Sequence, residues 1–171
     1  FKADICGAPT HTITGLLTGS GNATPDYGNC KYLMQFGTQA GVATRHGMGI
    51  TAKIFAESRK NGCKLVNFDP HMSGAAEKAD EWIPIRPATD LALILAMAHV
   101  LVEEDLYDHD YVENYTVGFE DWAQRLGEYT PAWAEKITGI PADTIDRLAH
   151  EFAEAAPAAS IEQGWRAATG C

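Results

Sequence analysis

The sequence predicts an α/β protein with a parallel sheet, and three observations indicate this class. Short apolar runs that end at glycine or at Asp-Pro alternate with longer stretches of helical spacing. The composition is that of a globular chain, because 46% of the residues are hydrophobic and 21% are charged. A chain of 171 residues is also long enough to bury a sizeable core without disulfides or a structural metal.

The strands and helices of the first half follow from short local patterns. Apolar runs of five or six residues predict three strands, of which the last is the weakest: 31–36, 64–69 and 81–85. Residues 49–60 show helical spacing and end at Asn61-Gly62, which is typical of a helix C-terminus. The preceding region, 1–30, is rich in loop residues and is predicted to hold a short helix near 12–17.

The second half is predicted to be mainly helical. Its first helix is the apolar run 91–102, which is too short to span a bilayer and is capped by Thr89 or Asp90. This helix has almost no polar face, so it is expected to be covered on most sides. Shorter helices are predicted after it, at 110–115, 119–129, 131–138 and 141–155, followed by a last strand at 158–162.

Charge and cysteine spacing exclude several classes of function. The net charge is −10, from 13 Lys and Arg against 23 Asp and Glu. This argues against a nucleic-acid partner and against an anionic membrane surface, and no segment predicts direct membrane insertion. The four cysteines are Cys6, Cys30, Cys63 and Cys171. No two have the C-x-x-C spacing of a zinc ribbon or a ferredoxin cluster.

Two predicted strands end in residues that suit a bound ligand. Open α/β sheets bind ligands beyond the carboxyl ends of their strands, where Gly37 and Asp69 are expected. The Asp69 carboxylate can accept two hydrogen bonds from a diol or a guanine edge, although an acid in an Asp-Pro turn is an equally good interpretation. Asp90 is by default a helix cap, and it could also accept the donors of a bound base.

A second pattern predicts a nicotinamide dinucleotide site. Gly47 and Gly49, with Asp69 after the next strand, resemble a dinucleotide fingerprint. About ten residues separate Phe36 from Gly47, whereas the fingerprint follows its strand directly. An NAD-binding dehydrogenase domain is therefore the second hypothesis.

Cys6 lies in a polar loop that contains glycine and proline. A thiolate in such a loop can be stabilised by backbone N–H groups and can act as a soft metal ligand. A small buried hydrophobic side chain is the alternative interpretation for a single cysteine.

Five segments in order resemble the molybdopterin oxidoreductase family, the dimethyl sulfoxide reductase superfamily. They are residues 64–71, 79–90, 93–108, 111–119 and 129–141, and together with the Cys6 loop and the end of the chain the resemblance covers essentially the whole sequence. The resemblance implies a Rossmann-like segment with helices on both faces of a parallel sheet. It also implies a catalytic subunit that holds molybdenum or tungsten through two molybdopterin guanine dinucleotides. The implied reaction is the two-electron redox of a small oxyanion or of a sulfur or arsenic compound.

The resemblance also implies which residues form the site. Cys6 is implied as the metal ligand, and Asp69 and Asp90 as the residues that hold guanosine atoms. The other implied cofactor contacts are Gly37, Thr38, Gln39, Pro70, His71, Pro87 and Thr89. The family more often has Arg at His71 and Gly at Ala88. The end of the chain, Gln163 to Arg166, resembles the branch that reduces polysulfide, thiosulfate, tetrathionate or arsenate.

The chain is expected to be an internal fragment of that subunit, inactive alone. Residues 1–30 are expected to be the metal-ligand region, and residues 31–171 the binding segment. A [4Fe–4S] centre is expected only on a missing N-terminal part. The implied partners are an iron–sulfur electron-transfer subunit and a membrane anchor subunit, in a periplasmic or membrane-associated complex, with a cytoplasmic one left open. A cofactor-free scaffold of the same fold is the third hypothesis.

Overall fold

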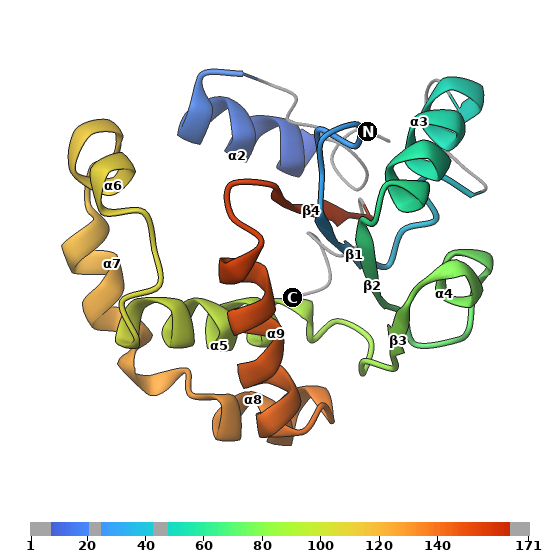
Figure 1. Ribbon diagram of the computed structural model, residues 1–171. Helices are drawn as coiled ribbons and strands as arrows, with labels where there is room; N and C mark the ends of the chain where they lie inside the picture. Colours follow the sequence, from blue (N-terminus) through green and yellow to red (C-terminus); the bar gives the residue numbers. More distant parts are fainter. Residues whose placement is uncertain (1–7, 21–24, 43–47, 165–171) are drawn as a thin grey trace. The chain divides into compact units, whose positions relative to one another are not determined.

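The computed structural model describes residues 8–20, 25–42 and 48–164. The chain divides into two compact units. The first contains the residues up to Ala88 together with those from Pro157 onward, and the second contains Thr89–Ala156. Figure 1 shows the helices and strands in order along the chain.

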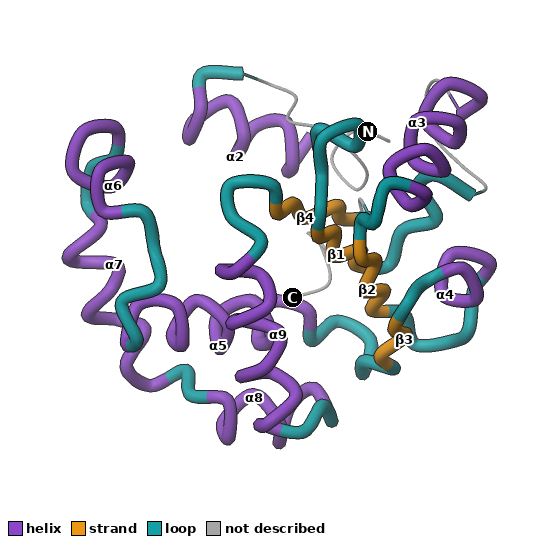
Figure 2. The backbone as a smooth tube through the Cα atoms, viewed as in Figure 1, coloured by secondary structure: helices purple, strands orange, loops and turns teal. Residues whose placement is uncertain are grey.

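The first unit is built on a parallel sheet of four strands, shown in orange in Figure 2. The strands are β1 (Tyr32–Phe36), β2 (Lys64–Phe68), β3 (Glu81–Ile83) and β4 (Ala159–Gln163). Their order across the sheet is β3-β2-β1-β4, and every neighbouring pair is parallel. The α/β class and all four strands predicted from the sequence are thereby confirmed.

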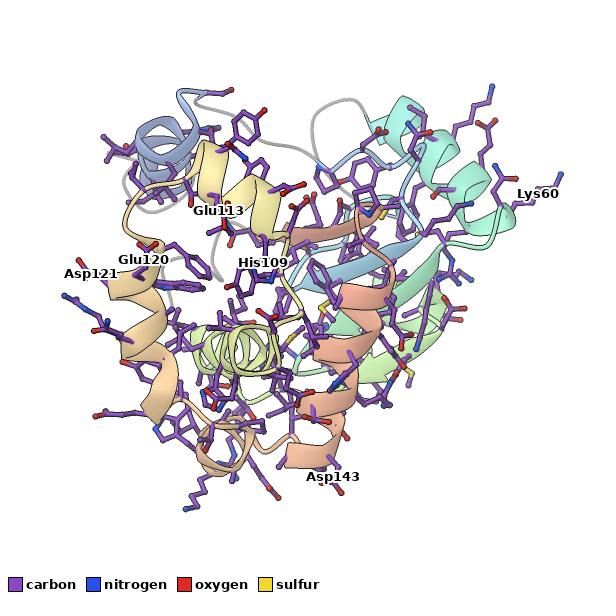
Figure 3. The ribbon with its side chains drawn as sticks, turned by 60° about the vertical axis from the view of Figure 1, so that its left-hand side comes forward. Lys60, His109, Glu113, Glu120, Asp121 and Asp143 are labelled. Carbon is purple, nitrogen blue, oxygen red and sulfur yellow. The ribbon has the colours of Figure 1, made fainter. Side chains whose placement is uncertain are left out.

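Among the described residues, the first unit contains the helices α2 (Ala8–Thr18), α3 (Met48–Lys60) and α4 (Gly74–Lys78). Phe55 of α3 packs with Leu33 and Leu65 in one buried cluster, so α3 covers one face of the sheet. Its last turn carries Arg59 and Lys60, which suit the negative end of the helix dipole. Lys60 points away from the sheet at the end of α3 (Figure 3).

Helix α4 is absent from the sequence prediction. It has only five residues, too few to show a helical period. Its start is nevertheless fixed locally, because the Ser73 hydroxyl accepts a hydrogen bond from the Ala76 N–H at 3.3 Å.

The second unit is helical, as predicted. It contains α5 (Asp90–Glu103), α6 (His109–Tyr115), α7 (Phe119–Arg125), the 3₁₀ turn η1 (Leu126–Glu128), α8 (Pro131–Thr138) and α9 (Ala142–Glu154). The single helix predicted over 119–129 is thus an α-helix followed by a 3₁₀ turn. Glu120 and Asp121 lie on the exposed side of α7 (Figure 3).

Helix α5 is the core of this second unit. It packs against α8 and α9, and its buried side chains include Leu93, Met97 and Val100. Leu91, in contrast, is 50% exposed, so not every side of this apolar helix is covered within the described residues. Across the residues that the structure describes, no helix combines the length and the apolar character needed to cross a membrane.

Candidate functional site

The carboxyl ends of three neighbouring strands are tied together at one edge of the sheet. The Gly37 N–H, just after β1, donates to the Phe68 carbonyl of β2 at 2.9 Å. The Gly164 N–H, just after β4, donates to the Phe36 carbonyl of β1 at 2.7 Å. Gly37 has a left-handed backbone with φ +54°, which glycine adopts without strain. The chain therefore turns sharply out of the central strand at the place where α/β sheets bind ligands.

Gly164 is packed against Gly37 so closely that no side chain fits between them. A Cβ atom built on Gly164 would lie 2.2 Å from the Gly37 carbonyl oxygen. The contact is with backbone, which cannot rotate away as a flexible side chain can. This edge of the sheet therefore depends on a residue without a side chain at position 164.

Asp69 follows β2 and is buried, with 5% of its surface exposed. One carboxylate oxygen, Oδ1, accepts a hydrogen bond from the His71 N–H at 3.2 Å and lies 3.0 Å from His71 Nδ1. Its backbone carbonyl accepts a hydrogen bond from Trp82 Nε1 at 2.9 Å. These contacts fix the position of the carboxylate and engage Oδ1, which leaves Oδ2 for a ligand. Asp69 is thus a turn acid, and the turn holds a buried carboxylate at the strand end.

The loop after β1 is closely packed rather than extended into solvent. Thr38 and Ala40 are buried, and the Thr38 hydroxyl accepts a hydrogen bond from the Ala40 N–H at 3.3 Å. The Val42 N–H donates to the Gln39 carbonyl at 3.1 Å, which closes a turn. The predicted site residues Gly37, Thr38 and Gln39 therefore form one fixed segment beside Asp69 at the carboxyl edge.

Two buried amides, Gln35 and Asn67, lie opposite each other on β1 and β2. Asn67 Nδ2 donates to Gln35 Oε1 at 3.4 Å, and Gln35 Nε2 donates to the Ala40 carbonyl at 2.9 Å. Asn67 Oδ1 is buried and has no hydrogen-bond partner among the described residues. The sequence analysis missed this pair, although two amides at matching places in apolar strands were the available signal.

The segment that joins the two units contains three predicted site residues. Pro87 is exposed, and the next residue, Ala88, has a left-handed backbone with φ +63°. Thr89 is the N-cap of α5, as predicted, but its side chain makes no capping hydrogen bond. Asp90 opens the helix, and burial raises the pKa of its carboxyl group. Thr89 and Asp90 belong to the second unit.

Other residues singled out from the sequence lie either outside the described residues or inside a helix. Cys6, the predicted metal ligand, lies outside the described residues, as does Gly47. Within the described ranges no group of three or more His, Cys, Asp or Glu side chains could hold a metal ion. Gly49 lies inside α3, which begins at Met48, whereas β1 ends at Phe36. The direct strand-to-helix turn of a dinucleotide fingerprint is therefore not formed here.

Comparison with known proteins gives a consistent result. The family described as molybdopterin oxidoreductase matches residues 17–169. The thiosulfate reductase molybdopterin-containing subunit PhsA of Salmonella typhimurium is 41% identical over 169 residues, which cover 96% of this chain and 21% of that protein. The dimethyl sulfoxide reductase DmsA of Haemophilus influenzae is 36% identical over 165 residues, covering 85% of this chain and 20% of that protein.

A solved structure shares the fold. Acetylene hydratase from Pelobacter acetylenicus matches with a TM-score of 0.78 and 31% identity, covering 96% of this chain and 22% of that one. The chain thus spans about a fifth of the length of the curated relatives it matches.

Proposed function

Because this chain belongs to the molybdopterin oxidoreductase family, we propose that it binds one guanine dinucleotide of a bis-molybdopterin guanine dinucleotide cofactor. The cofactor, with molybdenum or tungsten, supplies the two-electron chemistry when bound, and the protein orients it. The observation that carries the proposal is the buried carboxylate of Asp69 beside the turn at Gly37, at the carboxyl edge of a parallel sheet.

The donor and acceptor groups at this edge fit a guanine ring. Guanine presents adjacent N–H donors, and an ionised carboxylate offers only acceptors. The His71 N–H holds Oδ1 of Asp69, so the carboxylate is oriented before a ligand arrives. The unpartnered Asn67 Oδ1, buried behind the same loop, is a further acceptor that the fold leaves unsatisfied. The residues present therefore fit the group.

The remaining contacts of the site are part of the same proposal. Asp90 of the second unit would receive guanosine donors of the cofactor, and they would offset the burial that raises the pKa of its carboxyl group. Pro70, His71, Pro87 and Thr89 would make further cofactor contacts. The Cys6 thiolate would be the metal ligand.

For the whole protein we propose reduction of a small oxyanion or of a sulfur or arsenic compound. The support is the activity of two relatives, a thiosulfate reductase subunit and a dimethyl sulfoxide reductase. A [4Fe–4S] centre, an iron–sulfur subunit and a membrane anchor subunit complete the proposal. A periplasmic or membrane-associated complex follows from it.

The experiment measures metal and nucleotide in the purified full-length subunit. Acid hydrolysis should release GMP, and elemental analysis should find molybdenum or tungsten. In Asp69→Ala, loss of two hydrogen bonds to a charged group, about 1.5 kcal/mol each, should weaken nucleotide binding roughly 100-fold. Glu57→Gln is the matched control, because Glu57 is an exposed carboxylate on α3.

Two outcomes would overturn the proposal. One is full GMP and metal content in a folded Asp69→Ala protein. The other is wild-type subunit, produced with molybdate or tungstate available, that contains neither metal nor nucleotide, as a cofactor-free scaffold would. Saturable NAD binding that Asp69→Ala abolishes would instead support the dehydrogenase alternative.

A further inference from the structure

Two buried cysteines lie next to each other at the amino ends of the two central strands. Cys30 precedes β1 and Cys63 precedes β2, and between them the Lys64 N–H donates to the Lys31 carbonyl at 2.8 Å. The side chains are 5% and 4% exposed and share one core cluster with Leu33 and other apolar residues. The Cys30 thiol donates to the Tyr32 carbonyl at 3.1 Å and the Cys63 thiol to the Lys64 carbonyl at 3.8 Å, and the two are not joined by a disulfide.

The two thiols differ in how readily they ionise. The adjacent Cys30 thiol lowers the pKa of Cys63 to about 6, against the opposing effect of burial. Ser58 and Arg59 of α3 act in the same direction, whereas the nearby Asp80 acts against it. The adjacent Cys63 thiol and burial raise the pKa of Cys30. Cys63 is therefore the more readily ionised thiol of the pair, and Cys30 the one that holds its proton more tightly.

A cavity of about 200 Å³ lies beside Cys30. Its lining consists of Asp26, Asn29, Cys30, Pro157, Ala158 and Ser160. A water molecule occupies about 30 Å³ of liquid, so a small polar oxidant such as hydrogen peroxide fits in this space. Cys30 lines the cavity and Cys63 does not, so the oxidant reaches the Cys63 sulfur from the Cys30 side of the pair. Larger disulfide reagents would need the strand ends to open.

We propose that Cys30 and Cys63 are an oxidation site, at which hydrogen peroxide forms an intramolecular disulfide between the amino ends of β1 and β2. The Cys63 thiolate attacks one peroxide oxygen, the O–O bond breaks, and the released hydroxide takes a proton to become water. Cys30 sulfur then attacks the resulting Cys63 sulfenic acid. The S–O bond breaks, and the second hydroxide leaves as water with the proton of Cys30.

The reaction balances as two thiols and one peroxide giving one disulfide and two waters. The sulfur atoms lose two electrons together, and the peroxide gains them. A resolving thiol next to a sulfenic acid also prevents irreversible oxidation to sulfinic acid. The pair thus suits a reversible modification that a thiol reductant removes.

Peptide mapping of the full-length subunit tests the proposal. After treatment with peroxide, the protein is denatured without reductant, alkylated, and digested with trypsin and chymotrypsin. Cleavage after Leu17 or Tyr27 separates Cys6 from Cys30, and cleavage at Lys60 and Lys64 isolates Cys63. The expected product is a linked Cys30–Cys63 peptide, lighter by about 2 Da than its two thiol peptides and absent after dithiothreitol. Recovery of both as separate alkylated peptides, or linkage to Cys6, Cys171 or a second copy instead, would overturn it.

The pH dependence and two variants separate a reactive pair from two inert core thiols. At pH 7 a thiol of pKa about 6 is roughly 90-fold more ionised than one of pKa about 9. The rate of disulfide formation should therefore rise through pH 6 and level off by about pH 7.5. A rate that still rises tenfold per pH unit at pH 8 would contradict the proposal, and this measurement needs no variant.

In Cys30→Ser, Cys63 should advance to sulfinic acid, because no resolving thiol remains. Cys63→Ser should leave Cys30 largely unreacted, because burial still raises its pKa. Equal and slow reaction of the remaining cysteine in both folded variants would show two inert thiols.

Discussion

The contact between Gly164 and Gly37 makes Gly164→Ala a sharp test of the carboxyl edge. The added Cβ would lie 2.2 Å from the Gly37 carbonyl oxygen and 2.9 Å from its carbonyl carbon. Cβ atoms essentially never come closer than 3.0 Å to such atoms, so the two backbones must separate by 0.8 Å, the difference of 3.0 and 2.2 Å. The Gly164 N–H hydrogen bond to Phe36, now 2.7 Å, would then approach 3.5 Å and be lost.

The expected magnitude follows from these two effects. Loss of one backbone hydrogen bond destabilises by about 1 kcal/mol, and forcing an extra carbon into a packed site adds about 1–3 kcal/mol. Gly164→Ala should therefore lower the free energy of unfolding by about 2–4 kcal/mol. The matched control is Gly28→Ala in the same unit. Its Cβ would meet only Asp26 Oδ1 at 3.6 Å and Ile54 Cγ2 at 3.9 Å, which are ordinary contacts.

Urea unfolding of the full-length subunit, followed by Trp fluorescence, measures both variants. GMP released from the folded fraction reports on the edge itself, since Gly37 turns out of β1 at the proposed nucleotide site. Gly28→Ala should match the wild type in both measurements. A Gly164→Ala protein within 0.5 kcal/mol of the wild type, an order-of-magnitude limit for surface substitutions, would refute the reasoning from this contact.

Three further predictions concern the second unit and its junction. Ala88→Gly should raise the urea midpoint slightly, because relief of about 1–2 kcal/mol of left-handed strain exceeds the added chain entropy, and a lower midpoint would contradict this. Burial raises the pKa of Asp90 and so disfavours its ionised form, and Asp90→Asn should therefore raise the thermal midpoint of the cofactor-free subunit at pH 7. This advantage should shrink below about pH 4, because there the Asp90 carboxyl group is protonated in both the folded and the unfolded protein. The pKa of His150 is raised first by its hydrogen bond to the Asp146 carbonyl and then by its hydrogen bond to Glu104. Glu104→Gln should therefore lower the pKa of His150 measured by NMR titration. The stability that this pair contributes is present below about pH 6.5 and is lost as pH rises through the pKa of His150 in the folded protein. An unchanged His150 titration in Glu104→Gln would show that Glu104 does not act on this histidine.

The sequence predicts the elements of the fold well because their signals are local. The five residues of β1 and of β2 are short apolar runs, and the helix starts at Pro131 and near Pro141 follow from proline's place in the first turn. Helix α4 was not predicted, because a helix of little more than one turn is too short to show the helical period of hydrophobic residues. The strand order β3-β2-β1-β4 was not predicted either, because β4 follows the whole helical unit in the sequence and yet pairs with β1, which no local pattern indicates.

The candidate site was predictable only where it follows a strand. Gly37 and Asp69 could be placed at one edge, because parallel strands end on the same side of a sheet. The Gln35–Asn67 pair and the Gly164–Gly37 contact depend on register, which a one-residue shift would change throughout. The same holds for Cys30 and Cys63, which are far apart in the sequence and meet only because β1 and β2 pair.

The pairing register of β1 and β2 therefore sets the position of two different groups of residues, the cysteine pair at the amino ends of the strands and the candidate nucleotide site at their carboxyl ends. Tyr32 lies opposite Lys64 at the amino end and Phe36 opposite Phe68 at the carboxyl end. The strands are five residues long, roughly 16 Å, so the dithiol and the turn at Gly37 do not touch. Peroxide treatment that forms the Cys30–Cys63 disulfide should then leave the GMP content of the subunit unchanged, while Gly164→Ala should lower GMP content without reducing disulfide formation in its folded fraction. Loss of GMP in step with disulfide formation, with Cys6 still recovered as an unmodified thiol, would show instead that the sheet transmits strain from one edge to the other.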